Sequence, residues 1–214
     1  MRKSQVILLL GLLAWVDPAF AQKATIHPLT VSIHKSLESW VTSNDVKQIL
    51  KAASDLLQQP ANNCMVGFTL DKVTSFTSAP ASINDAADLE AVHSVPADVK
   101  VVRKINYCIR GPENDLVGCS WRPNRRPKTV IVSTDMMAWG LEHMVLAHEY
   151  GHVTGLLHRN DPRGEGLMTP CGIDASSYRI NKSECRHFIA GAVTKYPPGL
   201  GPNCAGDNSW RRTD

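Results

Sequence analysis

Three histidines and one glycine in a short segment constrain the fold of this chain more than any other feature. His148 and His152 are four positions apart, so on a helix that turns about 100° per residue they lie on one face, one turn apart. His158 follows six positions later, roughly 240° further around a continuing helix. The three rings can meet if the helix ends in between. Gly155 tolerates the left-handed conformation of a helix end and predicts where that end lies.

Three neutral imidazoles that meet at one point are typical of a catalytic zinc site, because such a site keeps its fourth position open. We therefore predict one catalytic Zn²⁺ ion, held by His148, His152 and His158. Glu149 projects beside the first two histidines and is the candidate catalytic base, which takes a proton from activated water and delivers it to the leaving amine. The alternative is that these are ordinary histidines on a helix. A chance match to the whole pattern is rare, because the glycine and the third histidine must also stand at fixed offsets.

The segment HEYGHVTGLLH, residues 148–158, resembles the HExxHxxGxxH motif of the metzincin clan of zinc peptidases. The stretch Gly166-Leu167-Met168-Thr169-Pro170 resembles the methionine turn of the same clan, with Met168 ten residues after His158. The resemblance implies that Met168 forms the hydrophobic floor below the histidines; simple core packing is its other interpretation. It also implies a secreted zinc-dependent endopeptidase that hydrolyses peptide bonds of an extended protein or peptide substrate.

Other positions depart from the named families of this clan. Arg159 follows the third histidine, where matrixins, astacins, adamalysins and serralysins carry Ser, Glu, Asp or Pro. Pro170 stands where astacins and serralysins carry a tyrosine, so no tyrosine ligand is expected. No cysteine-switch sequence of the PRCGxPD type precedes the motif. The chain is therefore not placed in any of these four families.

The clan resemblance implies an α+β fold: an upper lobe, about residues 22–155, with a twisted mixed sheet and long helices, and a small, mostly irregular or helical lower lobe, about residues 156–214. Hydrophobic periodicity and turn residues predict the elements themselves. Helices are predicted over 46–57, from Thr134 or Asp135 through the histidines, and over 183–193 with Ser183 as cap. Strands are predicted over 64–76, 99–109, 116–121 and 128–133, and a loop over 78–88. By resemblance, strand 116–121 is the sheet edge to which a peptide adds; an ordinary edge strand is equally consistent with it.

The N-terminus has the features of a cleaved export signal. Met1-Arg2-Lys3 precedes an apolar run from Val6 to Val16 and the small-x-small sequence Ala19-Phe20-Ala21. We predict a signal peptide over 1–21 and a single catalytic domain over 22–214, secreted or periplasmic. The apolar run is shorter than the roughly 20 residues that span a bilayer, so no stable membrane insertion is expected; an uncleaved anchor is the alternative.

Six cysteines in an exported chain indicate disulfide bonds. No CxxC pair occurs, which disfavours a zinc ribbon. Many connectivities are open to six cysteines, and the pairing we predict is Cys108–Cys119, Cys171–Cys185 and Cys64–Cys204.

The charge balance argues against nucleic acid as a partner. The formal net charge of +3 falls to about +2 without the signal peptide, which is too small to attract nucleic acid. The local cluster of Arg122, Arg125, Arg126 and Lys128 is interpreted as a solvated loop, with a patch for acidic substrate residues as the alternative. The chain is expected to act as a monomer.

Two other functions remain open. One is a zinc-containing binding module with little turnover, against which the presence of Glu149 argues. The other is a zinc hydrolase of a non-protein amide, such as a cell-wall crosslink. Of the remaining histidines, His143 and His187 are interpreted as surface or packing residues. The alternative is that they contact the metal ligands and help to orient them.

Overall fold

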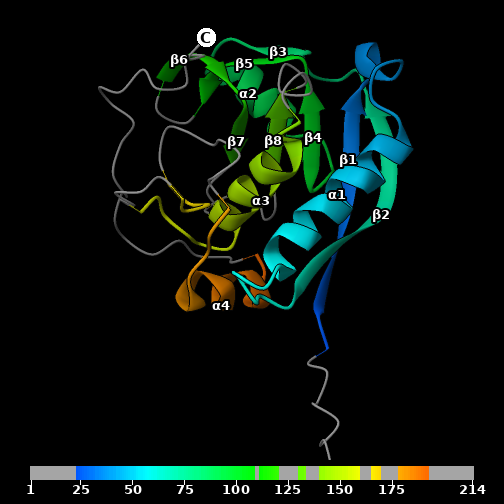
Figure 1. The fold of residues 1–214 in the computed structure, drawn as a ribbon. Coiled ribbons are helices and arrows are strands. Elements are labelled where there is room, and N and C mark those ends of the chain that lie inside the picture. The colour runs from blue at the N-terminus through cyan, green and yellow to red at the C-terminus, as the bar shows by residue number, and fades with distance from the viewer. Residues whose placement is uncertain are drawn as a thin grey trace, which may run out of the picture.

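The computed structural model describes residues 23–108, 111–120, 130–133, 140–159, 165–169 and 178–192. Within them, helices and strands form a mixed α/β architecture with a larger and a smaller sheet (Figure 1). This is compatible with the predicted α+β class. The predicted signal peptide and the basic cluster over 122–128 lie outside the described residues, as do Cys171 and Cys204.

The larger sheet has five strands in the order β2-β1-β4-β8-β7. β1 pairs in parallel with β2 and β4, β4 pairs in parallel with β8, and β7 is antiparallel to β8. The sheet is therefore mixed, as predicted, and in the described part of the chain β7 lies at its edge. β1 has no counterpart among the predicted elements. In sheet order, the bounds are Val66–Phe76, Thr25–His34, Val99–Val102, Val130–Ser133 and Gly118–Ser120.

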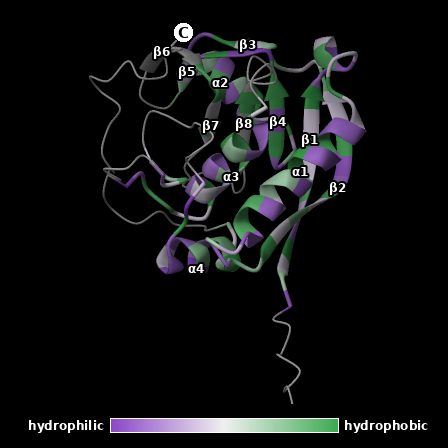
Figure 2. Ribbon diagram, viewed as in Figure 1, coloured by the Kyte–Doolittle hydropathy of each residue, from purple (hydrophilic) through white to green (hydrophobic). Residues whose placement is uncertain are grey.

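Helix α1, Ser43–Gln58, packs on β2 and against α3, Glu142–Val153, and confirms the predicted helix (Figure 1). Its first turn is closed by a capping box: the Thr42 amide donates to the Asp45 carboxylate at 2.8 Å, and the Asp45 amide donates to the Thr42 hydroxyl at 3.2 Å. Hydrophilic and hydrophobic residues alternate along the helix, as expected when one face is exposed (Figure 2). The buried face consists of Val46, Leu50, Ala53, Ser54, Leu56 and Leu57.

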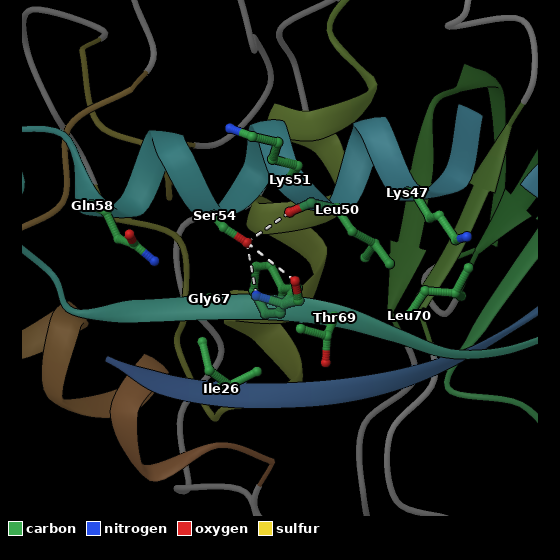
Figure 3. A pocket seen from close by; sticks show the side chains of 10 residues that line it. Ile26, Lys47, Leu50, Lys51, Ser54, Gln58, Gly67, Thr69 and Leu70 are labelled. Atoms are coloured by element: carbon green, nitrogen blue, oxygen red, sulfur yellow. Dashed lines mark hydrogen bonds between the residues drawn. The ribbon is translucent and has the colours of Figure 1, made fainter. Parts of the chain in front are cut away.

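Two polar side chains of α1 reach the outer edge of β2 (Figure 3). The Phe68 amide donates to Oγ of Ser54 at 2.7 Å. Nε2 of Gln58 donates to the Val66 carbonyl at 2.9 Å. These bonds satisfy backbone groups that an edge strand otherwise offers to other chains. A shallow, mainly apolar groove of about 390 Å³ lies along this edge, and none of the three motif histidines lines it.

The smaller sheet has the order β3-β5-β6, with bounds Ser82–Ile83, Lys104–Cys108 and Gly111–Leu116, and helix α2, Ala86–His93, packs against it. The loop predicted over 78–88 is therefore wrong in part. Asp85 accepts a hydrogen bond from the Asp88 amide at 2.9 Å and so caps a helix that begins inside this range. The strand predicted over 99–109 is in fact β4 and β5, which belong to different sheets.

Helix α3, Glu142–Val153, carries the motif and packs on β7 and β8 (Figure 1). The sequence predicts its start at Thr134 or Asp135. Both positions lie outside the described residues. The predicted helix is not continuous, however, because Gly140 stands in a turn with a φ of +67° and α3 begins at Glu142.

Helix α4, Lys182–Ala190, is shorter than the predicted helix over 183–193. The predicted cap is also wrong. Oδ1 of Asn181 accepts hydrogen bonds from the amides of Ser183 and Glu184, each at 2.9 Å, so the cap is Asn181. Gly191, with a φ of +75°, follows the last helical residue.

Two disulfides join described residues. Cys108–Cys119 is confirmed and links β5 to β7. Cys64 pairs with Cys185, so the predicted Cys171–Cys185 and Cys64–Cys204 bridges are wrong. The reason is packing: α4 lies against the chain between α1 and β2, and the Cα atoms of Cys64 and Cys185 are 5.5 Å apart.

The described helices include none that is both long and apolar enough to cross a membrane.

Candidate metal centre

The end of α3 turns the chain back toward the helix. The last helical residue is Val153, and Gly155 has a φ of +92°, which glycine adopts without strain. The Leu156 amide donates to the Gly151 carbonyl at 3.0 Å. The Gly155 amide donates to the His152 carbonyl at 3.0 Å, which completes the bond pair of a Schellman motif. The helix therefore ends where the motif spacing predicts.

Because of this turn, the imidazoles of His148, His152 and His158 meet. Their Nε2 atoms form a triangle with sides of 3.2, 3.1 and 3.0 Å. In a tetrahedral zinc site with bonds of about 2.0–2.1 Å, ligand nitrogens lie roughly 3.3 Å apart. The three residues therefore fit a single tetrahedral ion. Among the described residues, they are the group of His, Cys, Asp or Glu side chains that can hold a metal ion.

Backbone carbonyls orient two of the three rings. Nδ1 of His148 lies 2.6 Å from the Leu167 carbonyl oxygen, and Nδ1 of His152 lies 2.9 Å from the Leu156 carbonyl oxygen. A carbonyl oxygen can only accept, so Nδ1 carries the proton in both rings and Nε2 keeps the lone pair that a metal needs. Burial also lowers the pKa of His148 to about 3, which favours its neutral form.

Glu149 is buried between α3 and the edge strand β7, with 8% of its surface exposed. Burial raises the pKa of its carboxyl to about 7, and a hydrogen bond from Ser120 has a smaller, opposite effect. Oγ of Ser120 contacts Oε2 of Glu149 and also lies 2.8 Å from the Glu149 main-chain oxygen. The carboxylate does not belong to the group of three metal-binding side chains. Glu149 is therefore not a candidate ligand of the ion.

Gly118 on β7 makes room for this carboxylate. A Cβ atom at Gly118 would lie 2.6 Å from both Cγ and Oε1 of Glu149. Residues two apart on a strand face the same side, so Gly118 and Ser120 both face α3. The intervening Cys119 is buried and bonded to Cys108. Strand β7 thus forms one wall of the Glu149 site.

Met168 is fully buried in a turn below α3. The Thr169 amide donates to the Gly166 carbonyl at 3.0 Å and closes this turn. A Cβ atom at Gly151 would lie 2.5 Å from Sδ of Met168, so the methionine packs directly on the helix between the first two histidines. Core packing and a role as floor of the site are both consistent with this position.

The other described histidines do not join the metal-binding group. Nδ1 of His187 lies 3.0 Å from the Thr154 carbonyl oxygen, so it supports the end of α3 from α4. Nε2 of His27 lies 2.8 Å from the Phe188 carbonyl oxygen. His143 is half-buried, and burial lowers its pKa. None of these three residues is a metal ligand, and the contact of His187 with the end of α3 is compatible with either interpretation of that residue.

The sequence does not predict a role near the metal centre for three residues: Gly118, Ser120 and Gly151. Each of them acts through a contact with a distant part of the chain, on Glu149 or on Met168. The available signal is weak: two small residues flank Cys119, and a glycine stands inside the histidine motif. Neither pattern identifies its partner.

Neither a protein-family model nor a curated protein matches the chain. One solved structure to which it is similar is described as the structure of a chaperone–substrate complex, with a TM-score of 0.48 and 14% identity. The similarity covers 79% of this chain and 34% of the other, so this chain spans about a third of that protein's length.

Proposed function

We propose that this chain is an exported zinc-dependent endopeptidase. The observation that carries the proposal is the convergence of three Nε2 atoms at 3.0–3.2 Å, with a buried glutamate beside them. The metzincin-like motif at His148, His152 and His158, with Met168 in a turn beneath the helix, supports the same conclusion. The donor set of three neutral imidazoles suits Zn²⁺ and leaves a fourth position for reactants.

The chain's own residues have distinct roles in this proposal. A zinc ion, when bound, supplies Lewis-acid activation of water and of the scissile carbonyl. The Glu149 carboxylate accepts the proton of the attacking water and passes it to the leaving amine. Because Ser120 contacts Oε2, we assign the proton transfer to Oε1. The apolar floor and the buried surroundings of Glu149 limit access of other water.

We further propose a protein or peptide substrate in an extended conformation. The support is the edge position of β7, directly beside Glu149, because a sheet edge binds extended chains through backbone hydrogen bonds. Export is supported by the sequence of residues 1–21 and by two disulfides between described residues.

The test compares wild type with Glu149→Gln for zinc content and for casein cleavage. We expect one zinc ion per chain in both proteins, and loss of cleavage by several orders of magnitude in the variant. The matched control is Glu142→Gln, the same substitution at the start of the same helix, which should retain full activity.

Other results would redirect the proposal. If both proteins bind zinc and neither cleaves casein, purified cell-wall material is the next substrate, and inactivity there leaves a zinc-binding module. If wild type binds no zinc, the three-histidine site is wrong. If Glu149→Gln cleaves as fast as wild type, the glutamate is not the base.

A further inference from the structure

Arg159, the residue after the third histidine, is held through both its main chain and its side chain. Its amide donates to the Met168 carbonyl at 2.9 Å. Its Nε lies 3.0 Å from Oε1 of Glu184 on α4, and its Nη2 donates to the Arg179 carbonyl at 3.3 Å. The chain next to His158 is therefore attached to the methionine turn and to α4.

The ion pair between Arg159 and Glu184 differs from an ordinary surface salt bridge. The Glu184 side chain is 7% exposed and the Arg159 side chain is 31% exposed. Oε2 of Glu184 also accepts a hydrogen bond from the Asn181 amide at 2.7 Å, within the capping box of α4. A carboxylate in so buried a place needs its cation, because the charge is otherwise poorly solvated.

Helix α4 is itself anchored to the main core. Cys185, the residue after Glu184, is bonded to Cys64, which is fully buried. On the other side of the pair, a Cβ atom at Gly166 would lie 2.6 Å from Nη2 of Arg159, so the methionine turn packs on the guanidinium. A continuous path of contacts leads from the core through α4 to the residue beside His158.

The three histidines lie in different local structure. His148 and His152 lie on α3, and backbone carbonyls orient both rings. His158 lies beyond the helix end, in a segment with no regular secondary structure. No helix backbone holds it there, so contacts of the neighbouring residues contribute to its place in the triangle of nitrogens.

We infer that Arg159 is a positioning residue for the third metal ligand: its ion pair with Glu184 locks His158 in the geometry that binds zinc. The inference rests on the zinc site of the proposed function and does not require hydrolysis. It gives a role to the residue at which this chain departs from the four named metzincin families.

The test measures the dissociation constant for Zn²⁺, with a competing chelator, at a temperature well below unfolding. We expect Arg159→Gln and Glu184→Gln each to weaken zinc binding by about 10–100-fold. This is the usual effect of removing a residue that orients a metal ligand without itself binding the metal. Both substitutions remove the same contact, so the double variant should bind no more weakly than Arg159→Gln alone. Arg159→Lys keeps the charge and should restore part of the affinity.

The neighbouring ion pair of Arg179 and Glu165 provides a matched control. Its Nε to Oε2 distance is also 3.0 Å, but its side chains are 49% and 29% exposed. Arg179→Gln should leave zinc affinity within about twofold of wild type, because exposed pairs contribute little. If Arg159→Gln does not fold, Glu184→Gln decides the matter, since glutamine has the volume of glutamate and can keep the bond to the Asn181 amide.

The inference is overturned if Glu184→Gln and any folded Arg159 variant bind zinc within twofold of wild type, or if Arg179→Gln weakens binding as much as they do. Failure of the proposed function gives a different result: wild type binds zinc but cleaves nothing, while the affinities still rank as expected. A wild-type chain that binds no zinc would overturn both.

Discussion

Nδ1 of His152 and the carbonyl oxygen of Leu156 lie 2.9 Å apart, so the chain just beyond the helix end orients a ligand on the last turn of that helix. The turn at Gly155, with a φ of +92°, makes this contact possible. Gly155→Ala should cost about 1–2 kcal/mol of unfolding free energy, because a side chain is strained in this conformation. Relief of the strain moves Leu156, so zinc affinity should also fall, by roughly tenfold.

Gly140→Ala is the control for Gly155→Ala. Gly140 has a φ of +67°, and in the described part of the chain no atom other than those of its sequence neighbours lies within 4 Å of the added Cβ. This variant should lose similar stability in urea unfolding and keep its affinity for zinc. Equal zinc affinities in both variants would show that the helix end does not position the ligands.

Ser120→Ala should lower kcat by about tenfold and leave KM and zinc content unchanged, because one hydrogen bond to a charged group is lost. The reason is the contact of its hydroxyl with Oε2 of Glu149. Ser54→Ala is the matched control, since Ser54 is also buried and bonds to the Leu50 carbonyl at 2.7 Å and to the Phe68 amide at 2.7 Å. It should reduce stability without changing kcat, and equal kcat values in the two variants would contradict the role of Ser120.

Gly118→Ala should reduce kcat by about a hundredfold, because the new methyl group displaces the Glu149 carboxylate by an ångström or more. Zinc content should stay at one ion per chain, since the three atoms nearest to the new Cβ all belong to Glu149, which is not a metal ligand in the three-histidine group. Gly67→Ala, on the opposite edge strand, meets the tip of Ile26 at 3.0 Å and should stay fully active. Steady-state kinetics of the three proteins decide the matter, and an active Gly118→Ala variant would contradict it.

Peptide mapping of the unreduced protein should identify a bridge between Cys64 and Cys185. Replacing both cysteines by alanine should lower the unfolding free energy by about 4–5 kcal/mol, because the bridge closes a long loop of the unfolded chain. Urea unfolding measures the change. A bridge from Cys64 to Cys204 in the map would contradict the structure.

The sequence predicts local features of this chain well. Helix α1 has apolar residues at helical spacing and a cap at Thr42, and both signals lie within a few turns. The meeting of the three histidines is also local, because His148 and His158 are joined by one helix end. In these cases the residues that determine the structure are close in sequence.

Strand β1 is harder to predict because it contains Pro28, and proline within a run normally argues against a central strand. The structure explains the exception. β4 pairs with β1 at Val31–Ile33, whereas Pro28 lies opposite Thr69 of β2, in a part of β1 that β4 does not reach. The missing amide hydrogen therefore removes no bond on the β4 side.

Long-range contacts could not be predicted from the sequence. Cys64 and Cys185 are separated by 121 positions, and their pairing depends on where α4 packs. The contact of Ser120 with Glu149 depends in the same way on how α3 lies on β7. No local pattern carries this information, because many arrangements of the same elements satisfy the same periodicities.

The contact between His27 and Phe188 has a consequence for the order in which the chain folds. It joins the first strand to the last described helix, with 2.8 Å between Nε2 of His27 and the Phe188 carbonyl oxygen. A ribosome synthesises the N-terminus first, so this contact cannot form until residue 188 has been made. Pairing of β1 with β2 and β4, by contrast, needs only the first half of the chain, so the contact with α4 is among the last that β1 can make.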